Sequence, residues 1–497
     1  MTEKSALGVR LSYVYLALPF AIFSLGWLRL YIGIPVFLLL GYGLWHAMRN
    51  APVIWTPPKG KSTYIRLAAV VGLVILVSVF SGIGALTYQN SDHYWRNSIL
   101  RALCQYRWPV YETNQAGETV SLVYYIGMWL PAALFGKLFG VNAAHIFMLV
   151  WVICGILLVF RLCLGLWQKF SLWPFLLFFL FGGLDFIWPL LSQHPELLWT
   201  FSHIEWASKL DPVSYGSPVF QYSSFVTQLY WVFNQALPAW LATVLVLLQK
   251  NNKNVIFIFS LLLINAPFPF IGLIPLAAVL IFTRRYEKAT DRRSWWKCWF
   301  SDTFTMCNVL CGGVIGVLTT LYITANQAVN SRAAGTDNVT HFVWKDFSDF
   351  HWFLLSYVIF VALEVLIYLI PLYKYCKKLP LYWAAAATLM IVPLFSIGGG
   401  HDFCMRASIP ALFMLFLLVV DTLRRSAAAR DYITCIALSV ILFLGIRASF
   451  NEFCRAVQET FHGNTYAGQF ELMKSETDPN FVARISHSFF YRFIARK

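Results

Sequence analysis

The chain has 497 residues, of which 59% are hydrophobic and only 12% are charged, against about 25% charged in a soluble domain. Its formal net charge is +15 and its mean hydropathy is +0.63. This composition excludes an ordinary soluble domain and predicts an all-α polytopic membrane protein. The basic residues punctuate the apolar runs instead of forming one patch, which argues against a nucleic-acid partner.

The apolar runs give the predicted elements in chain order. A helix needs about 20 apolar residues to cross a bilayer. The first run lacks a clear small-residue cleavage site, so we expect a retained helix and not a signal peptide. Two prolines in NAPFPF (265–270) separate two short spans and predict a helical hairpin with an irregular tip. The spans, about thirteen in all, are expected at residues 11–27, 31–48, 66–86, 142–162, 171–191, 235–249, 254–266, 269–283, 304–325, 351–373, 380–397, 407–423 and 432–449.

Lysine and arginine in the short loops predict the orientation of these spans. With the N-terminus in the cytoplasm, most of the basic residues fall in short inside segments. The long polar segments 87–141, 192–234 and 326–350 then lie outside. Residues 1–449 are expected to form one membrane module, followed by a small outside tail at 450–497.

Two helices are expected at the outer surface. Residues 119–139 are apolar enough to span, but a span here would turn every later basic loop outward. We therefore expect a helix that lies at the interface. Residues 92–103 carry an apolar stripe, with Asp92 and Arg96 four apart on a polar face.

The first outside segment carries an ordered set of motifs. Asp92 follows a span, and a short amphipathic helix ends in RWPVYE (107–112). The stretches YYIGMWLPAALFGKLFG (124–140) and VNAAHIFMLVWVICGILLVFRL (141–162) come next. Over residues 85–165 this order resembles the GT-C superfamily of integral-membrane glycosyltransferases, in particular the bacterial aminoarabinose transferase and protein O-mannosyltransferase branch.

The resemblance implies a function and a place for it. It implies a GT-C-like helix arrangement and an enzyme that moves a sugar from a polyprenyl-phosphate donor to an acceptor, with inversion. The acceptor would be a glycan, a glycolipid or a protein. The site would lie on the periplasmic side of a bacterial inner membrane, in contact with membrane lipids. No cofactor is certain, although a divalent metal ion is compatible with the pattern. The chain departs from the family by two additional spans at its start, and by Asp92-His93 where an acidic pair is common.

Asp92 is the first catalytic candidate. The resemblance gives it a role toward the acceptor, whose hydroxyl must lose a proton as it attacks the anomeric carbon, and a carboxylate in reach can take that proton. The alternative is a helix N-cap by Ser91 or Asp92.

The second outside segment carries His203, Glu205 and Lys209 within a few residues. We expect His203 and Glu205 to be catalytic and Lys209 to contact the donor phosphate, with Arg96. The alternative to these roles is that the residues are polar only because an outside loop is exposed to water.

The sequence HDFCMR (401–406) is the strongest signal after Asp92. Asp402 and Arg406 stand four apart, and a charged pair at membrane depth is costly unless it serves a function. The planar guanidinium of Arg406 suits a phosphate and could stabilise a leaving group. The alternative is a mutual salt bridge that anchors the end of a helix.

Several further polar side chains are expected to bind substrate, and capping or bonds between helices are the alternative for them. They are His93, Gln221, Asn234, Gln235, His401 and Asp402. Among Cys104, Cys404 and Cys454 the sequence leaves room for one disulfide that it does not assign.

Two other functions remain open. A polymerase or ligase acting on lipid-diphosphate donors would also use outside loops with arginine and histidine. A lipid or solute transporter would place its polar groups near the midplane of the bilayer and show internal repeats, which the sequence does not display.

Overall fold

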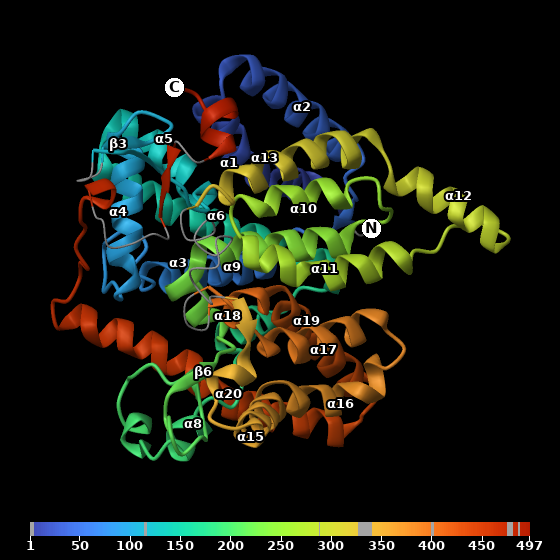
Figure 1. Cartoon of the computed structure of the whole chain (residues 1–497). Helices are drawn as coiled ribbons and strands as arrows, with labels where there is room; N and C mark the ends of the chain where they lie inside the picture. Colours follow the sequence, from blue (N-terminus) through green and yellow to red (C-terminus); the bar gives the residue numbers. More distant parts are fainter. Residues whose placement is uncertain are drawn as a thin grey trace.

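The computed structural model describes residues 4–113, 117–287, 289–326, 340–398, 402–474, 481–485 and 488–497. Helices dominate these segments (Figure 1). His401, one of the expected substrate-binding residues, lies outside the described segments.

Seven helices in the described segments are long and apolar enough to cross a membrane, and the number is eight if one bent pair is counted as a span. This supports an integral membrane protein, but thirteen spans are not confirmed. The bent pair joins α12 (Arg292–Thr303) to the helix Cys307–Ile323, which ends as α13 (Gly313–Ile323), at an angle of 52°. The seven are α1 (Leu7–Trp27), α2 (Leu30–Arg49), α3 (Lys61–Val79), α6 (Val141–Trp167), α9 (Phe225–Leu248), the Phe350–Cys376 helix that contains α15 (Phe350–Val361) and α16 (Ile367–Cys376), and α20 (Tyr432–Phe461).

Short helices replace several of the expected spans. The run 171–191 is broken, with α7 (Trp173–Leu180) and α8 (Ile187–Leu191) on either side of the Gly182-Gly183 pair. The helical hairpin forms as α10 (Val255–Leu263) and α11 (Pro267–Phe282), and α11 starts at the proline that the sequence predicts as a breaker. The expected span 380–397 is represented by the short helix α17 (Pro380–Ile391). The expected span 407–423 is represented by α19 (Ile409–Ala428), which has 20 residues but carries Asp421, Arg424 and Arg425.

Two spans are longer than their apolar runs. Helix α9 begins ten residues before the expected start at 235, and α20 continues twelve residues beyond the expected end at 449. In both cases polar residues are buried against neighbouring segments, which a count of apolar residues cannot detect. Both extensions lie beside the candidate site.

Short strands add to the expected all-helical fold. Strands β3 (Tyr111–Thr113), β4 (Thr119–Leu122) and β9 (Val482–Arg484) form an antiparallel sheet that joins the first outside segment to the tail. The expected interfacial helix 119–139 is therefore a strand in its first part, and α5 (Leu130–Phe139) is its second part. Three two-stranded pairs complete the set: β1 (Lys4–Ser5) with β2 (Ile54–Trp55), β5 (Ala207–Ser208) with β6 (Pro218–Phe220), and β7 (Thr340–Phe342) with β8 (Phe395–Ile397).

The loops separate into two ends of the bundle. In Figure 1, β3, α5 and α4 (Asp92–Gln105) gather at one end, and the N-terminus and α12 at the other. Loops also contact one another, because Lys209 donates to the carbonyl of Asp346 and Arg284 donates to that of Gln249. Which end faces the cytoplasm stays a prediction.

Helix α9 forms the centre of the fold. Nearly all of its residues are buried, and Phe225 and Trp240 pack against phenylalanines of α7 and α19. The backbone is kinked at Val232, where φ is −142° and ψ is 34°. The kink lies beside Tyr230, whose carbonyl accepts hydrogen bonds from α4 and the residues just before it. The kink therefore positions the Tyr230 carbonyl that α4 and the residues before it contact.

Candidate active site

Asp92 and Arg96 form an ion pair at the start of α4. The Arg96 Nη2 and Asp92 Oδ2 atoms are 2.8 Å apart, and the Arg96 side chain is 9% exposed against 42% for Asp92. Ser91 makes no side-chain capping bond, and the carboxylate of Asp92 faces Arg96. The N-cap alternative is therefore not what is observed, although Asp92 does occupy the first helical position.

Arg96 is buried, which differs from the expected wet face of this helix. Its Nη1 donates to the carbonyl of Tyr230 over 3.1 Å, and its guanidinium lies 5.4 Å from the centre of the Phe233 ring. Burial lowers the pKa of Arg96, and the charge of Asp92 opposes that shift. The guanidinium is thus held at a fixed place against α9.

Arg406 forms a second pair of the same kind. It lies on α18 (Asp402–Ala407), where its Nη2 is 2.8 Å from Asp402 Oδ1. The expected salt bridge is present, but Arg406 does more, because its Nη1 donates to the hydroxyl of Tyr125 over 2.7 Å. Its Nε is buried and has no hydrogen-bond partner among the described residues. Such an atom is costly to leave without a partner.

The two pairs lie in one electrostatic neighbourhood. Burial alone would lower the pKa of Arg406, but Asp402, the two tyrosine hydroxyls and Asp92 together raise it above its ordinary value. The positive charge of Arg406 in turn acts on Arg96. The hydroxyls of Tyr124 and Tyr125 bond to each other between the pairs. The Arg96 guanidinium, which is buried, and the Arg406 guanidinium, which is 12% exposed, therefore act on each other's charge, although the sequence separates them widely.

This arrangement can bind an anion and accept a proton. Buried guanidiniums offer several donors in fixed planes and suit phosphate oxygens. Asp92 is the more exposed of the two carboxylates in the pairs by a small margin, at 42% against 38% for Asp402. Each carboxylate occupies the first position of its helix, α4 or α18, and each is partly exposed.

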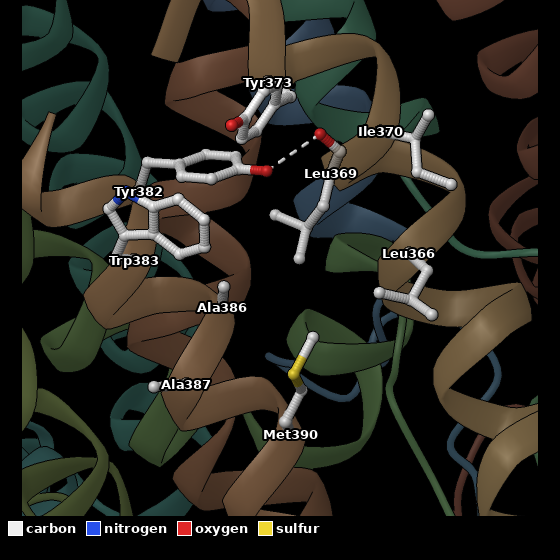
Figure 2. Close-up of a pocket in the computed structure, with 9 residues that line it drawn as sticks. All are labelled: Leu366, Leu369, Ile370, Tyr373, Tyr382, Trp383, Ala386, Ala387 and Met390. Atoms are coloured by element: carbon white, nitrogen blue, oxygen red, sulfur yellow. Dashed lines mark hydrogen bonds between the residues drawn. The ribbon is translucent and has the colours of Figure 1, made fainter. Parts of the chain in front are cut away.

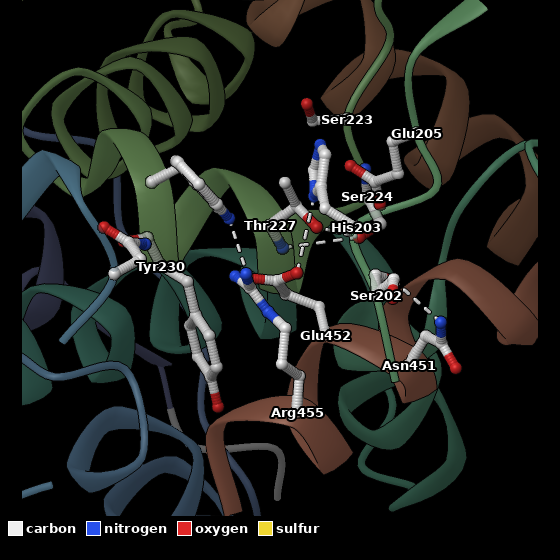
Figure 3. Close-up of polar contacts among 12 residues, drawn as sticks. Ser202, His203, Glu205, Ser223, Ser224, Thr227, Tyr230, Asn451, Glu452 and Arg455 are labelled. Carbon is white, nitrogen blue, oxygen red and sulfur yellow. Dashed lines mark hydrogen bonds and ion pairs between the residues drawn. The ribbon is translucent and has the colours of Figure 1, made fainter. Parts of the chain in front are cut away.

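His203 and Glu205 take different partners (Figure 3). Glu205 is buried, its Oε1 accepts from the backbone N–H of Ser224 over 3.1 Å, and its Oε2 has no partner in the described part of the chain. Burial raises the pKa of Glu205, while His203 opposes the shift. His203 Nδ1 lies 3.4 Å from Glu452 Oε2, and its Nε2 lies 3.4 Å from Gln221 Nε2.

Glu452 and Arg455 were not expected from the sequence. Glu452 is buried, and its Oε1 accepts from Trp231 Nε1 over 2.7 Å and from Arg455. The Arg455 guanidinium lies 5.3 Å from the centre of the Trp231 ring. Because Trp231 follows Tyr230 on α9, this network adjoins the Arg96 site. The sequence offers only a weak indication of this pair, because Glu452 and Arg455 are two opposite charges three residues apart, just after an apolar run.

The other expected residues divide between these regions and more distant ones. His93 is buried, donates from Nε2 to the carbonyl of Ser81 over 3.1 Å, and has a pKa well below its ordinary value because of burial. Lys209 contacts Asp346 and the Phe347 ring and is not among the contacts of Arg96 or Arg406.

Asn234 and Gln235 are both buried on α9 after the kink. Neither polar atom of the Gln235 amide has a hydrogen-bond partner among the described residues. A buried amide without partners is expected to meet a polar ligand or water. Gln235 therefore stays a candidate for substrate binding.

The structure bears on two further expectations, a divalent metal ion and one disulfide. Within the segments that the structure covers, no group of three or more His, Cys, Asp or Glu side chains could hold a metal ion. Cys104, Cys404 and Cys454 are all free thiols, so the disulfide that the sequence left open is not formed.

A separate apolar groove lies between α16 and α17 (Figure 2). Its volume is about 410 Å³, and Tyr382 donates to the carbonyl of Leu369 at its edge over 3.0 Å. None of the expected site residues lines it. The lining residues are Leu366, Leu369, Ile370, Tyr373, Tyr382, Trp383, Ala386, Ala387 and Met390.

Compared with known proteins, the chain matches no family model, no curated sequence and no solved structure.

Proposed function

We propose that the chain is a membrane glycosyltransferase of the GT-C kind, which transfers a sugar from a polyprenyl-phosphate donor to an acceptor hydroxyl. The observation that carries the proposal is the hydrogen bond from Arg406 to Tyr125, which links the Asp402–Arg406 pair to the segment between α3 and α6 that also holds the Asp92–Arg96 pair. Their buried guanidiniums suit the phosphate of the donor.

Each residue has a role in the proposed reaction. Arg406 and Arg96 hold the donor phosphate, and Asp402 and Tyr125 fix the orientation of Arg406. The acceptor oxygen attacks the anomeric carbon while its proton passes to Asp92. The bond from the anomeric carbon to the phosphate oxygen breaks, and polyprenyl phosphate leaves with the electron pair. A single displacement of this kind inverts the anomeric configuration.

The location of the site follows from the orientation that the basic loops predict. With the N-terminus in the cytoplasm, α4, α5 and α18 lie toward the periplasmic or extracellular side. The donor would reach the site from the membrane, among its lipids. A glycan, a glycolipid or a protein would enter from water as the acceptor.

Turnover with defined donors tests the proposal. The purified chain in lipid nanodiscs receives a sugar linked to polyprenyl monophosphate or to polyprenyl diphosphate, with a mixture of acceptor hydroxyls. The measurement is the release of the matching leaving group, polyprenyl monophosphate or polyprenyl diphosphate. Release from the monophosphate donor that is lost in Arg406→Gln supports the proposal. Turnover of the diphosphate donor alone would instead assign the chain to polymerases or ligases, and turnover of neither would contradict transfer.

One observation favours a transporter as a second candidate. Glu364 is buried within the spanning segment Phe350–Cys376, and its Oε1 has no partner among the described residues. Asp185 and Glu205 are also buried. The charge of Glu364 acts on Asp185, and the charge of Glu205 acts on both of the other carboxylates. A buried carboxylate within a membrane span, such as Glu364, often carries protons or ions. Proton-driven solute uptake into vesicles that is abolished by Glu364→Gln, with no sugar transfer, would favour transport.

A further inference from the structure

A large cavity lies at the end of the bundle opposite the candidate active site, where Figure 1 marks the N-terminus. Its volume is about 720 Å³. Its wall is formed by β1, by the residues around β2 and by the ends of α6 and α9. Arg284, which follows the end of α11, completes the wall. Its apolar lining includes Ile54, Leu166 and Leu247, and its polar lining includes the residues considered next.

Positive charge dominates the lining of this cavity. Lys4, Lys250 and Arg284 line it, and no carboxylate does among its described lining residues. Three helices, α6, α9 and α11, end near it, and each helix end carries roughly half a negative charge. These ends would balance about half of the three full positive charges. A net positive charge therefore remains for a ligand.

Arg284 has donor capacity that its protein contacts do not use. Its Nη1 donates to the carbonyl of Gln249 over 2.7 Å, and its Nε to Asn252 Oδ1 over 3.3 Å. Its Nη2 is buried and has no partner within the described part of the chain. An anion in the cavity would provide the missing acceptor.

A second cavity, of about 470 Å³, shares Arg284 and adds Arg285 and Arg292. The one carboxylate in its lining is Asp291, whose Oδ1 caps α12 by accepting from the backbone N–H of Ser294 over 2.9 Å. The carboxylate is thus already engaged. Five basic residues therefore surround the two cavities.

The side chains of α12 indicate that these cavities lie near the level of lipid headgroups. It projects from the bundle in Figure 1 and is bent by 52° from the helix that follows it. It carries Arg292, Arg293 and Lys297, together with exposed Trp296 and Phe300. Basic and aromatic side chains on one helix are typical of a helix that lies at the level of lipid headgroups.

We propose that the cavity lined by Lys4, Lys250 and Arg284 binds a phosphate-bearing anion, and that its source is the headgroup of an anionic lipid in the adjoining leaflet. The phosphate lies between the two lysines and the free Nη2 of Arg284. The apolar lining residues face the glycerol and upper acyl chains. This site is independent of the proposed transferase reaction.

The test is a lipid titration of the full chain in neutral detergent, followed by native mass spectrometry that counts retained lipids. The probes are phosphatidylglycerol, phosphatidylcholine and inorganic phosphate. We expect one saturable phosphatidylglycerol site. Its affinity falls roughly fivefold in each of Lys4→Gln and Lys250→Gln, the factor that corresponds to about 1 kcal/mol per basic residue near an anionic surface.

Two control variants separate the cavity from general charge. Lys345→Gln removes an exposed lysine that lines neither cavity, and Lys297→Gln removes one on α12 outside both cavities. Neither should change the saturable site. Equal effects of Lys297→Gln and Lys250→Gln, equal retention of phosphatidylcholine, or binding of inorganic phosphate without lipid would overturn the proposal. Because Arg284→Gln could disturb folding, the lysine variants carry the test.

Discussion

The guanidinium of Arg406 donates a hydrogen bond to the hydroxyl of Tyr125 over 2.7 Å. This contact joins α18, late in the chain, to the segment before α5, between α3 and α6. The charge of Arg406 acts on Arg96 of the Asp92–Arg96 pair, which contacts α9 beside its kink. The site is therefore built from three segments that only the folded chain brings together.

Asp92→Asn should reduce sugar transfer by roughly 10²–10⁴-fold while the fold persists, because the amide oxygen can still accept from Arg96 but cannot take a proton. The measurement is the rate of polyprenyl phosphate release at saturating donor. Asp421→Asn is the matched control, since Asp421 pairs with Arg425 at the same i,i+4 spacing on α19, away from the site. Unchanged turnover in Asp92→Asn would remove this residue from the role of base.

Tyr125→Phe should weaken donor binding without abolishing transfer. It removes one hydrogen bond to a charged group, which contributes about 1.5–3 kcal/mol, or roughly 10- to 100-fold. We expect KM for the donor to rise and kcat to change less. Arg406→Lys should behave similarly, because lysine keeps the charge but not the planar donors. A loss confined to kcat in both variants would contradict a role in holding the donor.

Glu205→Gln should change the pH dependence of stability. Burial raises the pKa of Glu205 in the folded state, so the folded chain holds this proton more tightly than the unfolded chain does. This contribution to stability is present below the unfolded pKa of about 4.3 and is lost as pH rises toward the folded pKa. Thermal unfolding in detergent from pH 4 to pH 8 should show a smaller decline in the variant than in the wild type. An identical decline in both would mean that Glu205 does not titrate as its burial suggests.

Gly183→Ala should prevent correct packing of the chain. A Cβ at this position would lie 1.5 Å from Glu364 Oε2, a separation that requires the backbone or Glu364 to move. Yield after size-exclusion chromatography should fall sharply. Gly316→Ala is the control, because nothing lies within 4 Å of a Cβ there and alanine favours a helix. Equal yields from the two variants would contradict the close contact between Gly183 and Glu364.

The helices that local sequence could predict are those with continuous apolar runs. The expected spans 11–27, 31–48 and 142–162 agree with α1, α2 and α6 within a few residues. The break before α11 was also predicted, because a proline removes a backbone donor wherever it occurs. The run 171–191 failed as a span, since two glycines interrupt it and the chain bends there.

The candidate site could be predicted only in part. Spacing alone placed Asp92 with Arg96 and Asp402 with Arg406, because residues four apart share a helix face. No sequence pattern indicates Tyr125 as the partner of Arg406, or Glu452 as the partner of His203. Both contacts join segments far apart in the chain, and the register between such segments depends on the packing of the whole bundle.

The sheet of β3, β4 and β9 sets an order on biosynthesis. Its third strand comes from Val482–Arg484, so the first outside loop emerges from the ribosome long before its partner exists. During that interval β4 has an open edge, which invites pairing with other chains. A nascent chain whose synthesis stops in the region of α20 would thus expose the unpaired edge of β4. Cellular quality control could recognise this edge before any activity had been acquired.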